Sequence, residues 1–263
     1  MRGLRVGVVG TGEMGRPVLD RLVAAGHRVS AYARRSETRH ELASTGVEVV
    51  SSVADLGRDC EFVLIYVYSD EQVREVVFEG GLATAMVPGA IVVVHTTGSP
   101  ATMQAIGAQG CAVVDAPGSG GPMQAATGAL TLFAGGEAEH VARCRPVFAA
   151  YANNVIHFGP LGAGQKVKLL NNLLFGAHLQ LALEAARVAE AFHIDVSEMA
   201  RALGDCSGAS YAVNLVAAMG SEALLQAAGP FVRKDVQVAR LAAAEIGAPL
   251  GLLESVTQGW LES

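Results

Sequence analysis

Lys168 and Asn172 are the residues whose types and spacing are best suited to proton transfer. They lie about one helical turn apart, in a stretch from Val167 to Ala189 that is apolar on nearly every side. A lysine on a buried helix is costly to desolvate unless it faces a polar cleft, and in an apolar setting it loses its proton more readily. Lys168 could therefore act as a general acid or base. The alternative is that its side chain simply extends from the first helical turn into water.

A glycine-rich segment near the start of the chain is suited to binding phosphates. It has the pattern G-x-G-x-x-G, follows an apolar run and precedes a helical pattern, and it reads Gly10-Thr11-Gly12-Glu13-Met14-Gly15. In this setting the first glycine permits a tight turn, the second lets the backbone approach a pyrophosphate, and the third allows close helix–strand packing. We therefore expect these six residues to bind a dinucleotide. A purely structural turn is the alternative.

The residues after the second expected strand indicate which dinucleotide is bound. An NAD site usually has an acidic residue there that accepts the ribose hydroxyls, but this chain has Arg34 and Arg35, and its next carboxylate is Glu37. Guanidinium groups pair with a 2′-phosphate, whereas a carboxylate would repel it. The sequence thus favours NADP over NAD. Two solvated surface arginines remain the alternative.

Strands and helices alternate in the first part of the chain and position these residues. Short apolar runs predict strands at 4–9, 28–33, 47–50, 62–67, 90–95, 112–115, 130–134 and 155–158, with helical patterns between several of them. Beyond about residue 164 only helices are expected, at 165–192, 196–203, 209–226 and 231–258. The sequence therefore predicts an α/β fold: a Rossmann-type doubly wound parallel sheet over 1–160, then an all-α domain over 161–263.

Composition excludes several classes of function. The net charge is −6, which argues against a general affinity for nucleic acid. Apolar runs such as Ala90–Val94 are far shorter than the roughly 20 residues of a membrane span. The four cysteines lack metal or redox spacing, so no metal site is expected. With no leader pattern at the N-terminus, we expect a cytoplasmic protein that binds neither nucleic acid nor membrane.

Two later segments, together with the glycine-rich one, resemble those of a known family. They are Asp115-Ala116-Pro117-Gly118-Ser119-Gly120-Gly121 and residues 162–172, which follow the pattern G-x-G-x-x-x-K-x-x-N-N. Both are similar to segments of the β-hydroxyacid dehydrogenases, the family of 3-hydroxyisobutyrate dehydrogenase and tartronate semialdehyde reductase. The resemblance implies hydride transfer between a nicotinamide and a small 3-hydroxyacid, or its semialdehyde or oxo acid, with Lys168 as the acid/base.

The resemblance also implies roles for other residues. Ser119 and the backbone of Gly120 and Gly121 would hold the substrate carboxylate, and Asn172 would orient the substrate. Cofactor contacts are implied for Val67, Thr97 and Lys234, although Lys234 could equally be a solvated helix residue. The chain departs from the family where Tyr66 and Tyr68 flank Val67, and where Gly118 replaces a commoner apolar residue. These departures leave the identity of the substrate open.

Two other functions are considered. An imine reductase shares the fold and the NADP preference, but such enzymes generally lack the lysine found here at Lys168. A catalytically silent NADP-binding module need not keep Ser119, Lys168 and Asn172 together. The long apolar helix expected at 165–192 has more apolar surface than a domain of about 100 residues can bury, so a homodimer or homotetramer is expected, as in the family.

Overall fold

The computed structural model describes residues 3–262 and divides the chain into two compact units. The first unit ends at Lys168 and the second begins at Leu169. The division falls inside one long helix, α9 (Ala163–Ala191), which contributes residues to both units. The domain boundary expected at residue 160 stays a prediction. The two units share the helix α9, so the compact units do not by themselves define where a domain begins.

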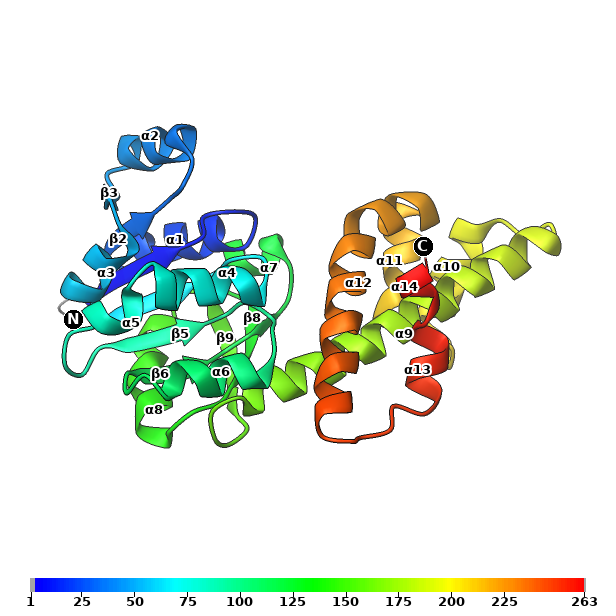
Figure 1. Ribbon diagram of the computed structural model, residues 1–263. Helices are drawn as coiled ribbons and strands as arrows, with labels where there is room; N and C mark the ends of the chain where they lie inside the picture. The colour runs from blue at the N-terminus through cyan, green and yellow to red at the C-terminus, as the bar shows by residue number, and fades with distance from the viewer. Residues whose placement is uncertain (1–2, 263) are drawn as a thin grey trace. The chain divides into compact units, whose positions relative to one another are not determined.

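A six-stranded parallel sheet forms the centre of the first unit, and it confirms the predicted doubly wound α/β fold (Figure 1). The strand order is β3-β2-β1-β4-β5-β6. Most strand residues are fully buried, which fits their continuous apolar sequences. The strands are β1 (Arg5–Val9), β2 (Arg28–Tyr32), β3 (Glu48–Val49), β4 (Phe62–Ile65), β5 (Ile91–Val94) and β6 (Ala112–Asp115).

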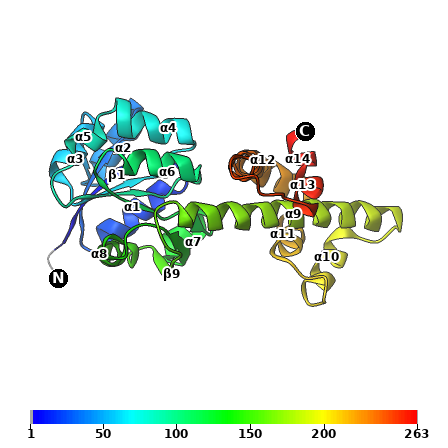
Figure 2. The same cartoon turned by 60° about the horizontal axis from the view of Figure 1, so that its bottom comes forward.

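Helices cover both faces of this sheet and create two apolar cores (Figure 2). One core packs the strands against α1 (Gly15–Ala24), α2 (Ser36–Ser44), α7 (Pro122–Thr127) and α8 (Ala138–Phe148). The other core contains α3 (Val53–Asp59), α4 (Asp70–Arg74), the π-helical turn η1 (Glu75–Glu79), α5 (Leu82–Ala85) and α6 (Pro100–Gly107). This double covering explains why the strand sequences lack polar alternation.

A second, three-stranded sheet completes the first unit, in the order β7-β8-β9. Of its strands, β8 (Leu130–Ala134) matches the expected run, and β9 (Ala152–His157) overlaps the run expected at 155–158 but begins three residues earlier. The third, β7 (Gly118–Ser119), was not expected, because two residues are too short for a periodic signal. It pairs antiparallel with β8 and so fixes the backbone within residues 115–121, hereafter the D-A-P segment.

A buried histidine links the ends of β4 and β5 to the core. His95 is 5% exposed, and its ring lies 4.3 Å from the ring of Tyr66 in a stacked arrangement. Its Nδ1 lies 2.6 Å from the carbonyl oxygen of Ala116, and its Nε2 lies 3.0 Å from the hydroxyl of Tyr151. Burial lowers the pKa of His95 to about 3, so the ring is neutral at neutral pH. The ring of Tyr66 is therefore held against the core.

The second unit is helical throughout its described residues, as predicted, and has its own apolar core. After the C-terminal part of α9 come α10 (Val196–Gly204), α11 (Tyr211–Met219), α12 (Ser221–Glu245), α13 (Leu252–Thr257) and α14 (Gly259–Glu262). Trp260 closes this core: it is 3% exposed and donates from Nε1 to the carbonyl oxygen of Gly176 on α9 at 3.0 Å. Within residues 3–262, no helix is both long and apolar enough to cross a membrane.

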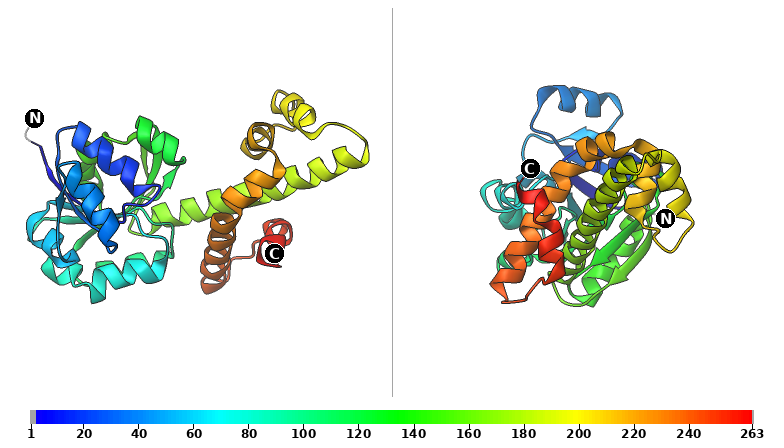
Figure 3. Two further views of the ribbon diagram at one scale, coloured as in Figure 1. Left: turned by 90° about the horizontal axis from the view of Figure 1, so that it is seen from above. Right: turned by 90° about the vertical axis from the view of Figure 1, so that its right-hand side faces the viewer.

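The bounds predicted for two helices, 209–226 and 231–258, were wrong. The structure has α11, α12 and α13 over this part of the chain. The helix α11 ends before Gly220, whose φ of 78° lies in the left-handed region that favours glycine. The chain then stays helical through Pro230, and α12 is bent along its length (Figure 3, left). Proline kinks a helix without always ending it, and here Leu224 and Val232 are buried in the same core on either side. Packing therefore outweighs the local helix-breaking signal.

Candidate functional site

Loops at one edge of the six-stranded sheet contain most of the residues singled out from the sequence. The loops that follow the carboxyl ends of parallel strands lie along one edge, and ligands bind there where the strand order reverses. This reversal falls between β1 and β4. Along the edge the loops follow in the order 33–35 after β2, 10–14 after β1, 66–69 after β4, 95–99 after β5 and 116–117 after β6.

The glycine-rich loop after β1 fits a dinucleotide pyrophosphate. A Cβ on Gly12 would meet no atom within 4 Å, so the backbone is open to a ligand at this position. A Cβ on Gly10 would overlap the carbonyl oxygen of Tyr66, and one on Gly15 would overlap the carbonyl oxygen of Gly10. The loop can therefore stay this close to β4 and α1 only with glycine at both positions. The open backbone leads into the N-terminus of α1, which favours an anion. Thr11, Glu13 and Met14 complete this loop.

Two arginines lie in the loop after β2 and a third lies on α2, and the sequence indicated a role for the first two. Arg34 and Arg35 are both exposed, and Arg35 is the residue that precedes the first turn of α2. The third, Arg39, donates from Nη1 to the carbonyl oxygens of Ala33 at 3.2 Å and Arg34 at 2.8 Å. Arg39 thus fixes the backbone that carries Arg34. Arg39 follows Arg35 by four residues, about one helical turn, and this spacing could have indicated from the sequence that it lies near the loop.

Two hydrogen-bonded links join the loops after β4 and β5. Thr96 is buried, and its hydroxyl oxygen both accepts from the backbone N–H of Val67 at 3.1 Å and donates to the carbonyl oxygen of Val67 at 2.9 Å. Asp70, the first residue of α4, accepts from the backbone N–H of Ser99 at 2.7 Å. These bonds therefore hold the backbone of Val67 close to the loop that contains Thr97.

Asp115, at the end of β6, ties the D-A-P segment to the start of α9. Its side chain is fully buried, and its two oxygens accept from the backbone N–H groups of Gly162 at 2.6 Å and Gln165 at 2.8 Å. Burial raises the pKa of Asp115, and these backbone donors oppose that rise. A carboxylate is also favoured at a helix N-terminus by the helix dipole. The segment leading to Ser119 and the turn carrying Lys168 are thereby brought together.

Gln165 extends this connection to the loop after β5. It is fully buried, donates from Nε2 to the carbonyl oxygen of Thr96 at 2.8 Å, and accepts at Oε1 from the backbone N–H of Gly98 at 3.0 Å. Sequence reasoning gave no role to Gln165, because polar residues such as Lys166 are common in the first turn of a helix and its burial could not be read from its type. The first unit therefore gathers Thr97, Ser119, Gly120, Gly121 and Lys168 on segments joined by Asp115 and Gln165.

Asn172 and Lys234 lie in the second unit, where Asp235 connects them. Asn172 follows Lys168 by one turn on α9, and its Nδ2 donates to the Oδ2 of Asp235. The other oxygen of Asp235 lies 2.9 Å from the Nζ of Lys234. Asp235 is only 8% exposed, and Asn171 donates to the side chain of Asn172 at 2.9 Å. A hydrogen bond from Asn172 to Asp235 thus joins α9 to the Lys234–Asp235 pair of α12.

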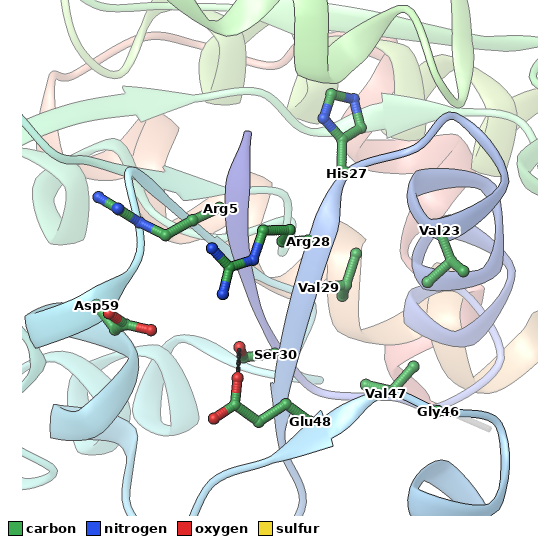
Figure 4. Close-up of a pocket in the computed structure, with 10 residues that line it drawn as sticks. All are labelled: Arg5, Val23, His27, Arg28, Val29, Ser30, Gly46, Val47, Glu48 and Asp59. Carbon is green, nitrogen blue, oxygen red and sulfur yellow. Dashed lines mark hydrogen bonds between the residues drawn. The ribbon is translucent and has the colours of Figure 1, made fainter. Parts of the chain in front are cut away.

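A cavity of about 270 Å³ lies elsewhere, at the amino ends of β1, β2 and β3 (Figure 4). Arg5 and Arg28, which are register partners on β1 and β2, contribute to its lining, together with His27 and Glu48. No residue of the motifs discussed above lines it. We therefore assign the candidate site to the carboxyl edge of the sheet and not to this cavity.

Two protein-family models match nearly all of the chain. Residues 5–159 match the model described as the NAD binding domain of 6-phosphogluconate dehydrogenase. Residues 162–263 match the model described as NAD-binding of NADP-dependent 3-hydroxyisobutyrate dehydrogenase. The first of these matches contains the glycine-rich loop and the D-A-P segment, and the second contains Lys168 and Asn172.

Individual proteins show the same similarity. L-threonate dehydrogenase of Cupriavidus necator is 39% identical over 186 residues, which are 68% of this chain and 63% of that protein, so less than two thirds of the relative is spanned. A structure of Mycobacterium tuberculosis 3-hydroxyisobutyrate dehydrogenase with L-serine is 25% identical, with a TM-score of 0.88 over 99% of this chain and 93% of that one. An imine reductase of Streptomyces aurantiacus shares the fold, with a TM-score of 0.70 at 16% identity over 98% of this chain and 93% of that one.

The first prediction concerns Asp115. Asp115→Ala would leave the backbone N–H groups of Gly162 and Gln165 buried without an acceptor, so we expect the free energy of unfolding to fall by about 3 kcal/mol. Asp115→Asn keeps one acceptor oxygen and should lose roughly half as much. Urea denaturation measures both. Asp59→Ala, which removes an exposed carboxylate, is the control and should change stability by less than about 0.5 kcal/mol. Native stability in Asp115→Ala would contradict the role of this carboxylate.

Proposed function

Because the chain belongs to the β-hydroxyacid dehydrogenase family, we propose that it is an NAD(P)-dependent oxidoreductase acting on a small carboxylate-bearing hydroxyacid. One observation carries this proposal: the bonds of Asp115 and Gln165 join the D-A-P segment, the loop after β5 and the turn of Lys168. The names of the relatives, which include L-threonate dehydrogenase and 3-hydroxyisobutyrate dehydrogenase, support a substrate of this class.

The proposed mechanism assigns one task to each group of residues. When bound, the dinucleotide supplies or takes up a hydride. Lys168 takes the proton of the substrate hydroxyl during oxidation and protonates the developing alkoxide during reduction. Ser119 and the backbone N–H groups of Gly120 and Gly121 hold the substrate carboxylate, where glycine leaves room for an anion. To do so, the N–H of Gly121 exchanges its present acceptor, the Oε1 of Gln124 at 3.0 Å, for the substrate. Asn172 orients the substrate, and Asp235 holds the Asn172 amide in place.

An assay of NADPH consumption with different substrates tests this function against its alternatives. An imine reductase would consume NADPH with cyclic imines, and a silent module would bind the dinucleotide without turnover. The similarity to imine reductases is one of fold, and Lys168 supports the hydroxyacid reading. Consumption of NADPH with small semialdehydes or 2-oxo acids, and not with cyclic imines, is the result we expect. Turnover of imines alone would overturn the proposal.

The second prediction concerns Lys168. Lys168→Ala should lower kcat by about 10²–10⁴-fold, the usual contribution of a positioned proton donor. NADPH affinity should stay nearly unchanged, because the lysine acts on the substrate oxygen. Lys168→Arg should be almost as inactive, since a guanidinium keeps its proton at any working pH. Steady-state kinetics and fluorescence titration measure the two effects.

Lys166→Ala is the matched control for this substitution. Lys166 lies two residues earlier on α9 and is exposed, so its removal should leave kcat close to native. Near-native turnover in Lys168→Ala, on a substrate that the native protein converts, would show that the catalytic assignment is wrong.

We further propose that NADP is preferred over NAD. Arg34 and Arg35 stand where an NAD site usually has a carboxylate, and Arg39 fixes the backbone of this loop. Val67, Thr97 and Lys234 are proposed as additional cofactor contacts.

The third prediction follows from this preference. NADPH should bind more tightly than NADH by about 1–3 kcal/mol, the scale of charge-assisted hydrogen bonds. Arg34→Asp should erode this difference, whereas Arg28→Asp, at the amino end of the same strand, should leave it unchanged. Fluorescence titration gives the dissociation constants of NADPH and NADH for the native protein and both variants, and their ratio is the quantity compared. Equal affinities of the native protein for the two dinucleotides would refute the assignment.

We also propose that the protein forms a homodimer or homotetramer through α9. Large apolar side chains on this helix are exposed at spacings of four and seven residues, which places them in one stripe. The stripe consists of Leu170, Leu174, Leu181 and Val188, each 49–59% exposed, and continues to Phe192 just after the helix. A continuous exposed apolar stripe of this length is typical of a surface that binds another protein.

The fourth prediction tests this assembly. Light scattering should give a mass at least twice the 27.1 kDa of one chain. Leu181→Glu should shift the protein towards the monomer, because the charge would be buried in the interface without a partner. Leu252→Glu is the control, since Leu252 is 84% exposed and lies outside the stripe. A native protein that is monomeric at micromolar concentration would contradict the proposal.

A further inference from the structure

A carboxylate stands next to the arginine proposed to bind the cofactor 2′-phosphate. The Nη1 of Arg34 lies 3.8 Å from the Oε2 of Glu75, and the two side chains are 65% and 52% exposed. Glu75 is the first residue of the π-helical turn η1, which continues directly from α4. An ion pair so exposed to water contributes little stability, so Arg34 can exchange this partner for another anion.

A polar group just after this loop is also engaged by a carboxylate. The hydroxyl of Ser36, the first residue of α2, donates to the Oε1 of Glu37 at 3.0 Å. Arg39, the third cation nearby, is committed to the carbonyl oxygens of Ala33 and Arg34. The loop after β2 therefore presents cations with carboxylates beside them, and it is not a purely basic pocket. A 2′-phosphate bound by Arg34 would lie next to the Glu75 carboxylate.

We propose that Glu75 sets how strongly the protein discriminates between NADP and NAD, by opposing a phosphate at Arg34. This inference rests on the proposed dinucleotide-binding function. Repulsion between unit charges about 4 Å apart in water corresponds to roughly a fivefold change in a binding constant. The carboxylate acts on the phosphate and leaves a ribose 2′-hydroxyl without such repulsion. Glu75 thus lowers the affinity for NADPH selectively, and the native preference for NADPH is smaller than the arginines alone would give.

Glu75→Gln tests this role, because it removes the charge and keeps the size of the side chain. We expect the ratio of the dissociation constants of NADPH and NADH to fall by about 3–10-fold at low ionic strength. The change should shrink in about 1 M salt, where the screening length is only about 3 Å. Glu79→Gln is the matched control: it removes the same charge from η1, and among residues 3–262 the ion pair of Arg34 is with Glu75 and not with Glu79.

Fluorescence titration of the full chain with each dinucleotide gives the ratio without relying on turnover. An unchanged or increased ratio in Glu75→Gln, or an equal fall in Glu79→Gln, would overturn the role of Glu75 and leave the proposed function intact. If the native protein bound neither dinucleotide, the proposed function would fail, and the role of Glu75 with it.

Discussion

The proposed site depends on the hydrogen bonds that the buried carboxylate of Asp115 accepts. This carboxylate lies at the carboxyl end of β6 and accepts two backbone hydrogen bonds from the start of α9. A fully buried carboxylate is tolerated only when such donors replace water. Because those donors belong to the turn that leads to Lys168, the same bonds that satisfy Asp115 fix the lysine relative to Ser119. The bonds that stabilise this part of the fold are therefore the same bonds that position the proposed site.

The hydrogen bonds continue from α9 across the sheet edge. Gln165 holds the loop after β5, and Thr96 in that loop holds both backbone polar groups of Val67. The ring of Tyr66 is in turn stacked on His95 in the core, so the residue before Val67 is held from the inside. The hydrogen bonds of Gln165 and Thr96 satisfy buried polar groups that would otherwise be costly, and the stacking of Tyr66 on His95 adds an apolar contact to the same edge.

The other end of the same edge is built differently. Arg34 and Arg35 after β2 are exposed, and Arg34 pairs with Glu75 through a contact that water weakens. The two ends therefore suit different tasks. As the proposed acid/base, Lys168 would need a fixed position because proton transfer depends on short distances, whereas the proposed binding of a phosphate at Arg34 depends on net charge and tolerates movement.

Much of this protein could be predicted from its residues alone, where the signal is local. Apolar strand runs indicated the α/β class, and the glycine pattern indicated the loop after β1, because backbone sterics admit only glycine at Gly10 and Gly15. Helix ends in the second unit could not be predicted in this way: Pro230 lies inside α12 because Leu224 and Val232 are both buried in one core. Glu75 meets Arg34, and Asp115 meets Gly162, only in the folded chain, since each pair is more than forty residues apart. Spacing in sequence reveals the neighbours of a residue on its own helix or strand, whereas partners brought by other elements depend on how the whole sheet is covered.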